Sequence, residues 1–333
     1  MYLNLRIIIF QLVKLDLKLY RGYANHEELI VTGHVFKSWA PDKYRLDKIG
    51  IRHAVSVLHM FRIEPYPNAE VTLNFKGLEV TTRTLDDGYF RFTLPFNESL
   101  ESGWHPYEVS CKIYDFGIVN CEELLKPFES KLGIISDIDD TFLISHSNSF
   151  FRKLYVLLLR NVNRRKIFDD VVKHYKALSS AGQTDERAFN SFFYVSSSEW
   201  NLYEFIDSFA RLHDLPKAVL KLKKIKTGIS DFLFTGRGSH DHKFEKIKDI
   251  ISFYPQLDYV LLGDDSQHDA QIYERICKIF PMNIKAVYIR QTKSRQKQKV
   301  NAILDNVEQM DVATCYFKYS NKAIEHSKTI GII

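Results

Sequence analysis

The chain contains little cysteine and no disulfide framework. Four of its 333 residues are cysteine, namely Cys111, Cys121, Cys277 and Cys315, and their spacing is scattered. A reduced, cytoplasmic protein is the simpler interpretation, and pairing of Cys111 with Cys121 is the alternative for an exported chain. Cysteine therefore gives no reason to expect a disulfide-rich secreted fold.

The apolar residues at the start of the chain are too few to form a membrane span. The segment from Arg6 to Val13 is far shorter than the roughly 20 residues of a transmembrane helix, and it lacks a small-residue cleavage site. It continues as Lys14 to Leu19, whose strict alternation predicts a β-strand. We therefore expect no transmembrane segment.

The sequence also lacks the signals of two classes of binding protein. His240 and His242 lie close together, but no cysteine or third histidine has the spacing of a zinc site. A formal net charge of +5 does not require a polyanionic partner, and no aromatic and basic RNA-binding motif is present. We therefore expect neither zinc nor nucleic acid as a ligand.

The residues that are present divide into two regions. A chain of 333 residues with 45% hydrophobic content can bury two cores, and we place the domains at 1–127 and 128–333. In the first region, β-rich segments predict strands at 29–36, 69–75, 79–84, 89–94 and 107–113. Asp86 to Gly88 predicts a hairpin turn, and Ile51 to Leu58 predicts a short amphipathic helix.

These segments predict a small antiparallel β-sandwich of the prealbumin-like kind. No residue in it suggests catalytic chemistry. Such a domain either braces an enzyme or binds a partner, a surface or a glycan. We favour bracing, because a fold alone implies no function.

From 128 onward strand and helix patterns alternate, which predicts an α/β domain built on a doubly wound parallel sheet. The apolar run Leu132 to Ser136 leads into Asp137 to Thr141. Two carboxylates at i and i+2, Asp137 and Asp139, suit phosphoryl transfer, since one can attack phosphorus while the other handles the proton of the leaving group. An acidic turn into solvent is the alternative interpretation.

Three further places along the chain agree with a phosphate-cleaving site. Phe192 to Val195 ends in Ser196, Ser197 and Ser198, and Tyr259 to Gly263 ends in Asp264-Asp265, with Asp269 shortly after. Between them, His242 to Ile251 predicts a helix that carries Lys243. Residues that follow parallel strands gather in one crevice. The alternatives are that the serines cap a helix and that Lys243 is one solvated lysine among several.

This ordered set resembles the aspartate-nucleophile phosphatases of the haloacid dehalogenase superfamily, and most closely the actin-patch phosphatidate phosphatases. The resemblance is carried by Ile135 to Thr141, Tyr194 to Tyr203, His242-Lys243, Leu262 to Asp269, Ile272-Tyr273, Ala286 to Arg290 and Tyr316 to Ile333. Two positions depart from that family, which usually has asparagine at Ser197 and proline at Glu199. Neither is a core catalytic position, so the departures concern substrate fit more than chemistry.

The resemblance implies a role for each site residue. Asp137 is the expected nucleophile, Asp139 the general acid and base, and Thr141 the residue that shapes their loop. Ser196, Ser197 and Lys243 are expected to bind the phosphate. Magnesium is the expected metal, because its small octahedral shell suits oxygen ligands and a shared phosphate. The implied ligands are Asp137, the Asp139 carbonyl and Asp264, with Asp265 nearby, while Asp269 would orient Lys243.

The resemblance further implies hydrolysis of phosphatidate to diacylglycerol and phosphate by a magnesium-dependent phosphatase. The alternatives are a soluble phosphomonoesterase of the same superfamily and an inactive scaffold or binding protein. A phospholipid substrate would place the protein peripherally at a membrane. The segment Phe151 to Arg160, followed by Arg164 to Lys166, predicts either a helix covering the sheet or a helix facing anionic lipid. Lysines at 221–226 and 293–299 could extend that basic face.

Overall fold

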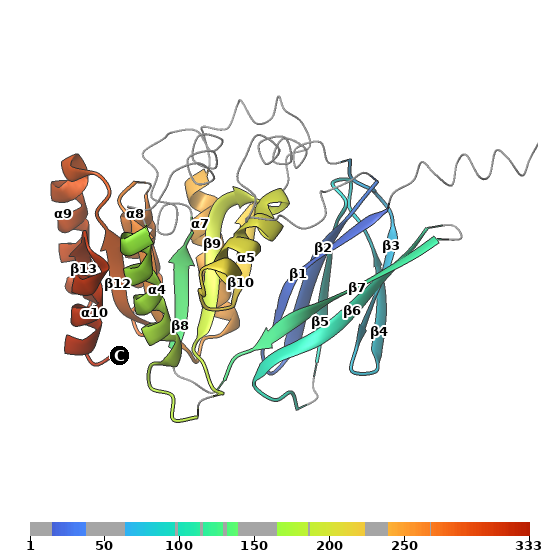
Figure 1. The fold of residues 1–333 in the computed structure, drawn as a ribbon, viewed down its shortest axis with the longest axis horizontal. Coiled ribbons are helices and arrows are strands. Elements are labelled where there is room, and N and C mark those ends of the chain that lie inside the picture. Colours follow the sequence, from blue (N-terminus) through green and yellow to red (C-terminus); the bar gives the residue numbers. More distant parts are fainter. Residues whose placement is uncertain are drawn as a thin grey trace, which may run out of the picture. The chain divides into compact units, whose positions relative to one another are not determined.

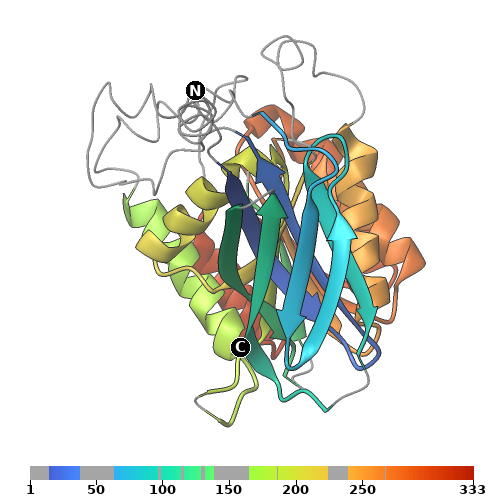
Figure 2. The same cartoon turned by 90° about the vertical axis from the view of Figure 1, so that its right-hand side faces the viewer.

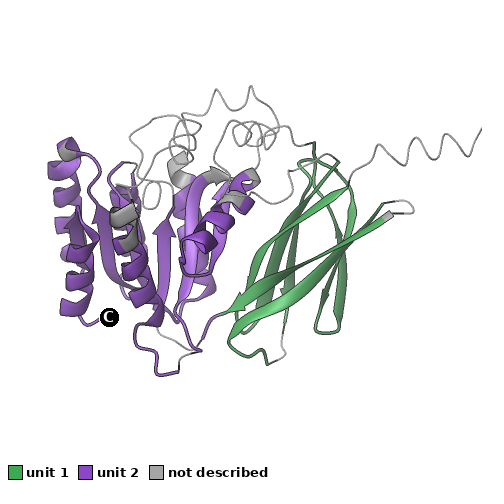
Figure 3. Cartoon of the chain, in the orientation of Figure 1, with its two compact units in different colours: residues 1–126, 224–235 green, residues 127–223, 236–333 purple. Residues whose placement is uncertain are grey.

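The structure is a computed structural model of the chain (Figure 1). It describes residues 15–37, 64–96, 99–113, 116–128, 132–138, 165–185, 187–223, 239–266 and 268–333. The described residues up to Lys126 form one compact unit, and those from Pro127 onward form a second (Figure 3). Each unit has a β-sheet of its own.

The first unit is a seven-stranded sheet with the order β4-β3-β6-β7-β1-β2-β5. Its strands are β1 (Asp16–Ala24), β2 (Glu28–Phe36), β3 (Glu70–Phe75), β4 (Leu78–Arg83), β5 (Tyr89–Pro95), β6 (Gly103–Ile113) and β7 (Phe116–Lys126). Neighbouring strands are antiparallel except β1 and β7, whose parallel pairing consists of Gly22 with Leu124 and Tyr23 with Leu125.

Alternating side chains form the core of this unit. In β3, Val71, Leu73 and Phe75 are buried while the residues between them are half-buried. Val71 lies opposite Cys111 and Leu73 opposite Val109 in β6, so apolar residues of adjacent strands share one face. A period of two residues is what a sheet with one buried face requires.

The strands predicted in this region are confirmed as β2 to β6, but the hairpin prediction is wrong. Asp86 to Gly88 does form a tight turn, in which the Gly88 amide donates to the Leu85 carbonyl over 2.9 Å. The turn joins β4 and β5, however, and these strands occupy opposite ends of the strand order. Local turn chemistry identified the bend, whereas strand pairing depended on contacts distant in sequence.

One strand of this unit was not predicted, and one predicted helix lies outside the described residues. Strand β7 went unpredicted, because its polar and acidic residues hide the alternation of a strand. The predicted helix from Ile51 to Leu58 lies outside the described residues.

The alternative disulfide between Cys111 and Cys121 is wrong. Both thiols are unpaired, with Cys111 buried and Cys121 exposed. The β6–β7 register explains why, since Cys111 faces Ile118 and Cys121 faces Glu108. Residues displaced by this much along adjacent strands exceed the Cα separation that a disulfide can bridge.

The second unit is a six-stranded sheet with the order β10-β9-β8-β11-β12-β13, and every neighbouring pair is parallel. Its strands are β8 (Leu132–Asp137), β9 (Ser191–Glu199), β10 (Ala218–Lys223), β11 (Asp258–Asp264), β12 (Ile284–Arg290) and β13 (Ala313–Phe317). The parallel sheet predicted for this region is therefore confirmed. Strands β10 and β13 were not among the predicted strands.

Helices cover both faces of this sheet. The described α-helices of the unit are α4 (Arg165–Ser180), α5 (Tyr203–Leu212), α7 (Ser239–Phe253), α8 (Asp269–Ile279), α9 (Lys297–Glu308) and α10 (Ser320–Thr329). Figure 2 shows α4 and α5 on one side and α7 and α8 on the other. Strands buried on both faces are continuously apolar, as Tyr259 to Leu262 of β11 are. Within the described part of the chain, no helix combines the length and apolarity needed to cross a membrane.

The helix-cap interpretation of Ser196 to Ser198 is wrong. All three serines lie in β9, which continues to Glu199 and is followed by a single 3₁₀ turn, Trp200–Leu202. Helix α5 begins at Tyr203, its N-cap is Leu202, and no side chain caps it. The helical segment Phe151 to Arg160 lies outside the described residues, so both interpretations of it stay predictions.

Candidate active site

The site lies where the strand order of the parallel sheet changes direction. The chain forms β8 first, adds β9 and β10 on one side, and then returns to add β11, β12 and β13 on the other. Such a reversal leaves a crevice outside the carboxyl ends of the two central strands. Asp137 is the last residue of β8 and Asp264 the last residue of β11, so both carboxylates are placed at this point.

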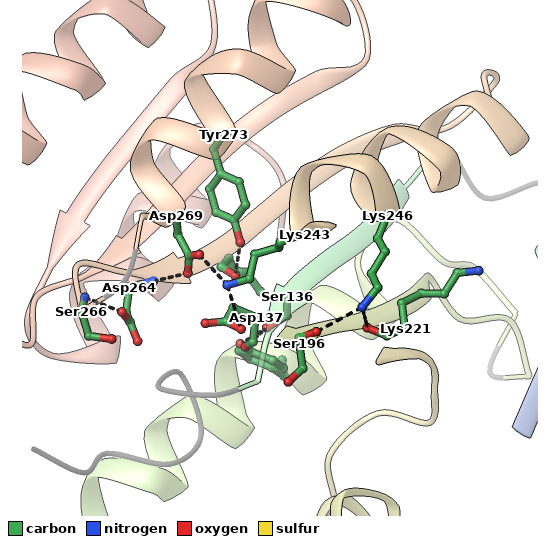
Figure 4. A network of polar contacts seen from close by, with 12 residues as sticks. Ser136, Asp137, Ser196, Lys221, Lys243, Lys246, Asp264, Ser266, Asp269 and Tyr273 are labelled. Atoms are coloured by element: carbon green, nitrogen blue, oxygen red, sulfur yellow. Dashed lines mark hydrogen bonds and ion pairs between the residues drawn. The ribbon is translucent and has the colours of Figure 1, made fainter. Parts of the chain in front are cut away.

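Lys243 joins two carboxylates at the centre of the site (Figure 4). Its Nζ lies 3.1 Å from Oδ1 of Asp137 and 2.6 Å from Oδ1 of Asp269. Lys243 is 2% exposed, and Asp137 and Asp269 are 1% and 0% exposed. Buried charges persist only when they are paired and hydrogen-bonded, so the three groups depend on one another.

The helical pattern of α7 explains why Lys243 is buried. Phe244, Ile247, Ile250 and Ile251 form the buried face of this helix, as the periodicity predicts. Lys243 precedes Ile247 by one turn and therefore lies on the same side. The interpretation of Lys243 as a solvated lysine is wrong, because its ammonium is held in the ion pairs of the site.

Gly263 allows Asp269 to approach the end of β11. A Cβ atom at position 263 would lie 2.6 Å from Oδ2 and 2.8 Å from Cβ of Asp269, and 2.9 Å from Cε2 of Tyr273. In the space that glycine leaves, Oδ2 of Asp269 accepts the backbone N–H of Asp264 over 3.2 Å. The Tyr273 hydroxyl donates to the Leu262 carbonyl over 2.8 Å. Helix α8 is thereby fastened to the strand that carries Asp264.

Ser196, Ser197 and Lys246 lie near the carboxyl end of the neighbouring strand, β9. Ser196 is 1% exposed and follows Val195, the residue that pairs with Asp137, so it lies one residue beyond the position of Asp137. Ser197 is half-buried. Lys246 donates from Nζ to the carbonyls of Ser196 over 3.3 Å and Lys221 over 3.1 Å. Lys246 was not among the predicted site residues, although its spacing of three residues from Lys243 was a signal that could have identified it.

The two adjacent acidic residues after β11 have different partners. Asp264 accepts the backbone N–H of Ser266 over 2.5 Å through Oδ1 and is 0% exposed. The carboxylate of Asp265 instead accepts hydrogen bonds from Thr292, Lys293 and Tyr316. The structure thus brings Asp137, Lys243 and Asp269 together, while the contacts of Asp265 lead toward the loop after β12. Asp139 and Thr141 lie outside the described residues.

The buried carboxylates of the site act on a neighbouring tyrosine. Burial, and then the nearby Asp269 and Asp137 carboxylates, raise the pKa of Tyr273 well above its usual range.

No three His, Cys, Asp or Glu side chains in the described ranges gather closely enough to hold a metal ion. Magnesium often needs only one or two protein carboxylates beside waters and phosphate oxygens. The all-oxygen donors Asp137 and Asp264 at adjacent strand ends fit that requirement.

Comparison with known proteins matches the region that contains this site. Residues 132–291 match the family model described as phosphatidate phosphatase APP1, catalytic domain. Phosphatidate phosphatase APP1 from Saccharomyces cerevisiae is 28% identical over 165 residues. The alignment covers 48% of this chain and 26% of that protein, so the chain spans about a quarter of the length of this relative.

Solved structures resemble the chain only weakly. The PilB minor pilin from Streptococcus sanguinis has 11% identity and a TM-score of 0.30, over 80% of this chain and 86% of its own. A carbohydrate acetylesterase from Xanthomonas citri has 9% identity and a TM-score of 0.29, over 96% of this chain and 75% of its own. At such TM-scores these likenesses carry no argument about fold or function.

Proposed function

Since residues 132–291 belong to the phosphatidate phosphatase APP1 catalytic-domain family, we propose that the protein hydrolyses phosphatidate to diacylglycerol and phosphate. The reaction proceeds through an aspartyl-phosphate on Asp137 and depends on magnesium. The observation that carries the proposal is the buried Lys243 ammonium, which lies 3.1 Å from Asp137 Oδ1 at the carboxyl end of the central strand. The position of this ion pair supports nucleophilic attack by Asp137 better than it supports a purely structural role.

Lys243 prepares the nucleophile and then receives the charge of the substrate. An ammonium in contact with a buried carboxylate favours its ionised form, and only that form attacks phosphorus. As the Asp137 oxygen bonds to phosphorus, Lys243 stays anchored by the 2.6 Å contact with Asp269. Its charge is then available to the phosphoryl oxygens, where preorganised donors stabilise the transition state most. Ser196 and Ser197 supply further hydrogen bonds from the neighbouring strand.

Proton transfer is assigned to Asp139 and loop geometry to Thr141. Asp139 protonates the departing diacylglycerol alkoxide and later takes a proton from the water that hydrolyses the aspartyl-phosphate. Asp137, the backbone carbonyl of Asp139 and Asp264 would hold magnesium, with Asp265 nearby. When bound, the ion neutralises charge on the phosphoryl oxygens.

The fold assignments extend the same proposal. The parallel sheet, with strand order β10-β9-β8-β11-β12-β13, supports a haloacid-dehalogenase-like doubly wound domain. In the first unit, residues of β1, β2 and β5 share one apolar core with residues of β3, β6 and β7, which supports a prealbumin-like sandwich. We assign that sandwich a bracing role. The lipid substrate places the protein peripherally at the cytoplasmic side of a membrane.

The test measures phosphate release from phosphatidate in mixed micelles, with magnesium or with EDTA. Wild type is compared with Asp137→Asn, which keeps the side-chain size but cannot form an acyl-phosphate. Loss of at least about 1000-fold in kcat is expected, because removal of a covalent nucleophile abolishes the main pathway. Asp185→Asn is the matched control, since the Asp185 side chain is 60% exposed and pairs with Arg187.

Each outcome separates the alternatives. Release that persists in Asp137→Asn near the wild-type rate refutes the nucleophile. Hydrolysis of a soluble aryl phosphate without any action on phosphatidate keeps the chemistry and identifies a soluble phosphomonoesterase. Wild type that is silent on both substrates identifies a scaffold or binding protein.

A further inference from the structure

Asp265 is more extensively hydrogen-bonded than an open metal ligand would be. Its Oδ1 accepts the backbone N–H of Thr292 at 2.7 Å, the Thr292 hydroxyl at 2.5 Å and the backbone N–H of Lys293 at 3.0 Å. Its Oδ2 accepts the Tyr316 hydroxyl at 2.7 Å and is 3.3 Å from the Lys293 nitrogen. A carboxylate offers about four lone-pair sites, and these contacts occupy them.

Two further hydrogen bonds join the turn that carries Asp264 to the end of the adjacent strand β12 and the segment after it. The backbone N–H of Asp265 donates to the Arg290 carbonyl over 3.0 Å. Nζ of Lys293 donates to the Ser266 carbonyl over 2.9 Å. Together with the Asp265 side chain, these bonds tie both the start and the end of the turn to the segment after β12. On its other side the turn is held by Asp269 Oδ2, which accepts the Asp264 amide over 3.2 Å.

Tyr316 brings the last strand of the sheet into this arrangement. It pairs with Ile289 in the β12–β13 register, so its hydroxyl reaches Asp265 across β12. Burial, and then the hydrogen bond and charge of Asp265, raise the pKa of Tyr316, which keeps the hydroxyl protonated as a donor. Thr292, Lys293 and Tyr316 all lie beyond residues 132–291, the part of the chain that the family model matches.

We propose that Asp265 is a positioning residue, which holds the Asp264 turn through Thr292, Lys293 and Tyr316 instead of binding magnesium itself. The inference rests on the proposed function, because the turn matters for a site in which Asp264 binds the ion. A metal bound by Asp265 would have to displace short hydrogen bonds from both of its oxygens. The side chain acts through its neighbours, and the segment after residue 291 becomes part of the active-site framework.

The test uses the full chain with Tyr316→Phe, Thr292→Val, Asp265→Ala and the double variant Asp265→Ala/Tyr316→Phe. Tyr288→Phe is the matched control, because the Tyr288 hydroxyl is also buried and bonds to Ser327 over 2.6 Å, away from the turn. The first readout is the magnesium concentration for half-maximal phosphate release. The second is the magnesium-induced shift in Tm, which needs no turnover.

Tyr316→Phe and Thr292→Val are expected to raise the half-saturating magnesium concentration about 10-fold, as is typical when a group that orients a metal ligand is lost. Tyr288→Phe is expected to lower Tm without changing that concentration. In the Asp265→Ala background, Tyr316→Phe should have no further effect, because its partner is already absent. The Tm shift should show the same pattern.

Wild-type magnesium response in Tyr316→Phe and Thr292→Val, with a lost response in Asp265→Ala, would overturn the inference and make Asp265 a direct ligand. If Asp265→Ala does not fold, the two other single variants still decide the matter against the Tyr288→Phe control. Wild type that shifts its Tm with magnesium but hydrolyses no phosphate ester would defeat the proposed function alone. Wild type with no magnesium-induced shift would defeat the inference.

Discussion

The two units of the molecule bury their polar groups in different ways. In the antiparallel unit, the buried Thr84 hydroxyl serves backbone groups of that unit: it donates to the Tyr66 carbonyl over 2.7 Å and accepts the Ala69 amide over 2.8 Å. In the parallel unit one group of buried polar side chains gathers at the carboxyl ends of the strands, namely Asp137, Ser196, Lys243, Asp264, Asp265 and Asp269.

Strand direction accounts for the difference. In an antiparallel sheet consecutive strands end at opposite edges, so the residues that follow them are divided between two ends. In a parallel sheet every strand ends at the same edge, so side chains far apart in sequence converge. Asp137, Ser196 and Asp264 become neighbours in this way, although up to 127 positions separate them along the chain. A parallel sheet thus gathers strand-end side chains at one edge, where Lys243 of α7 and Asp269 of α8 join them.

The largest effect is expected when the Lys243 ammonium, the cation at the centre of the site, is removed. Lys243→Met leaves the Asp137 and Asp269 carboxylates buried without their shared partner, which should lower the free energy of unfolding by about 3–5 kcal/mol. It should also reduce kcat by at least about 100-fold, because a preorganised charge is lost. Urea-induced unfolding and phosphate-release kinetics measure the two effects.

Lys248→Met on the same helix is the control for Lys243→Met. Its side chain is 45% exposed and its Nζ lies 3.7 Å from Glu245, so its unfolding free energy should stay within about 0.5 kcal/mol of wild type. Equal losses in the two variants would show that Lys243 has no special role.

Two glycines allow the same perturbation to be made in each unit. Gly263→Ala should force Asp269 away from β11, destabilise the protein by about 1–3 kcal/mol and lower kcat about 10-fold or more. Gly33→Ala crowds the first unit, since its Cβ would lie 2.4 Å from both the Lys18 carbonyl oxygen and Cζ of Phe90. It should destabilise that unit with kcat of the folded protein unchanged.

Gly117→Ala is the neutral comparison, because a Cβ there meets nothing within 4 Å. Steady-state kinetics below the unfolding transition separate the three glycine variants. A fall in kcat for Gly33→Ala as large as that for Gly263→Ala would contradict the division of roles between the units.

Acidification should also lower the free energy of unfolding, through one buried histidine in each unit. Burial lowers the pKa of His34 from 6.5 to about 3, and burial followed by the charges of Arg290 and His326 lowers that of His174 from 6.5 to about 4. Below pH 6.5, each histidine therefore binds a proton in the unfolded state that it does not bind in the folded state. The stabilisation is complete above pH 6.5 and is lost as pH falls toward these folded-state values.

Between pH 7 and pH 5 each of these histidines should remove about 2 kcal/mol of unfolding free energy. Urea titrations at the two pH values measure the loss. His34→Gln and His174→Gln should each reduce the pH dependence, and a slope as steep as wild type in both variants would show that other groups cause the acid sensitivity.

Particular elements show how far the sequence could be interpreted. The buried face of α7 and the strands that end at Asp137 and Asp264 follow directly from apolar periodicity, and the structure confirms them. The orientation of Lys243 by Asp269, expected from the family resemblance, agrees with their 2.6 Å contact. Strand β7 was missed, and a hairpin between β4 and β5 was wrongly predicted, because pairing partners distant in sequence leave no local signal.

The sequence by itself determined which residue types follow each strand, and hence that carboxylates, a serine and a lysine were available for phosphate chemistry. Only the tertiary structure decided how they divide their roles. Asp264 and Asp265 are adjacent in sequence, yet one lies at the crevice while the other accepts hydrogen bonds from Thr292, Lys293 and Tyr316. Successive residues at a strand end point in different directions, and what lies in each direction is set by packing between distant segments.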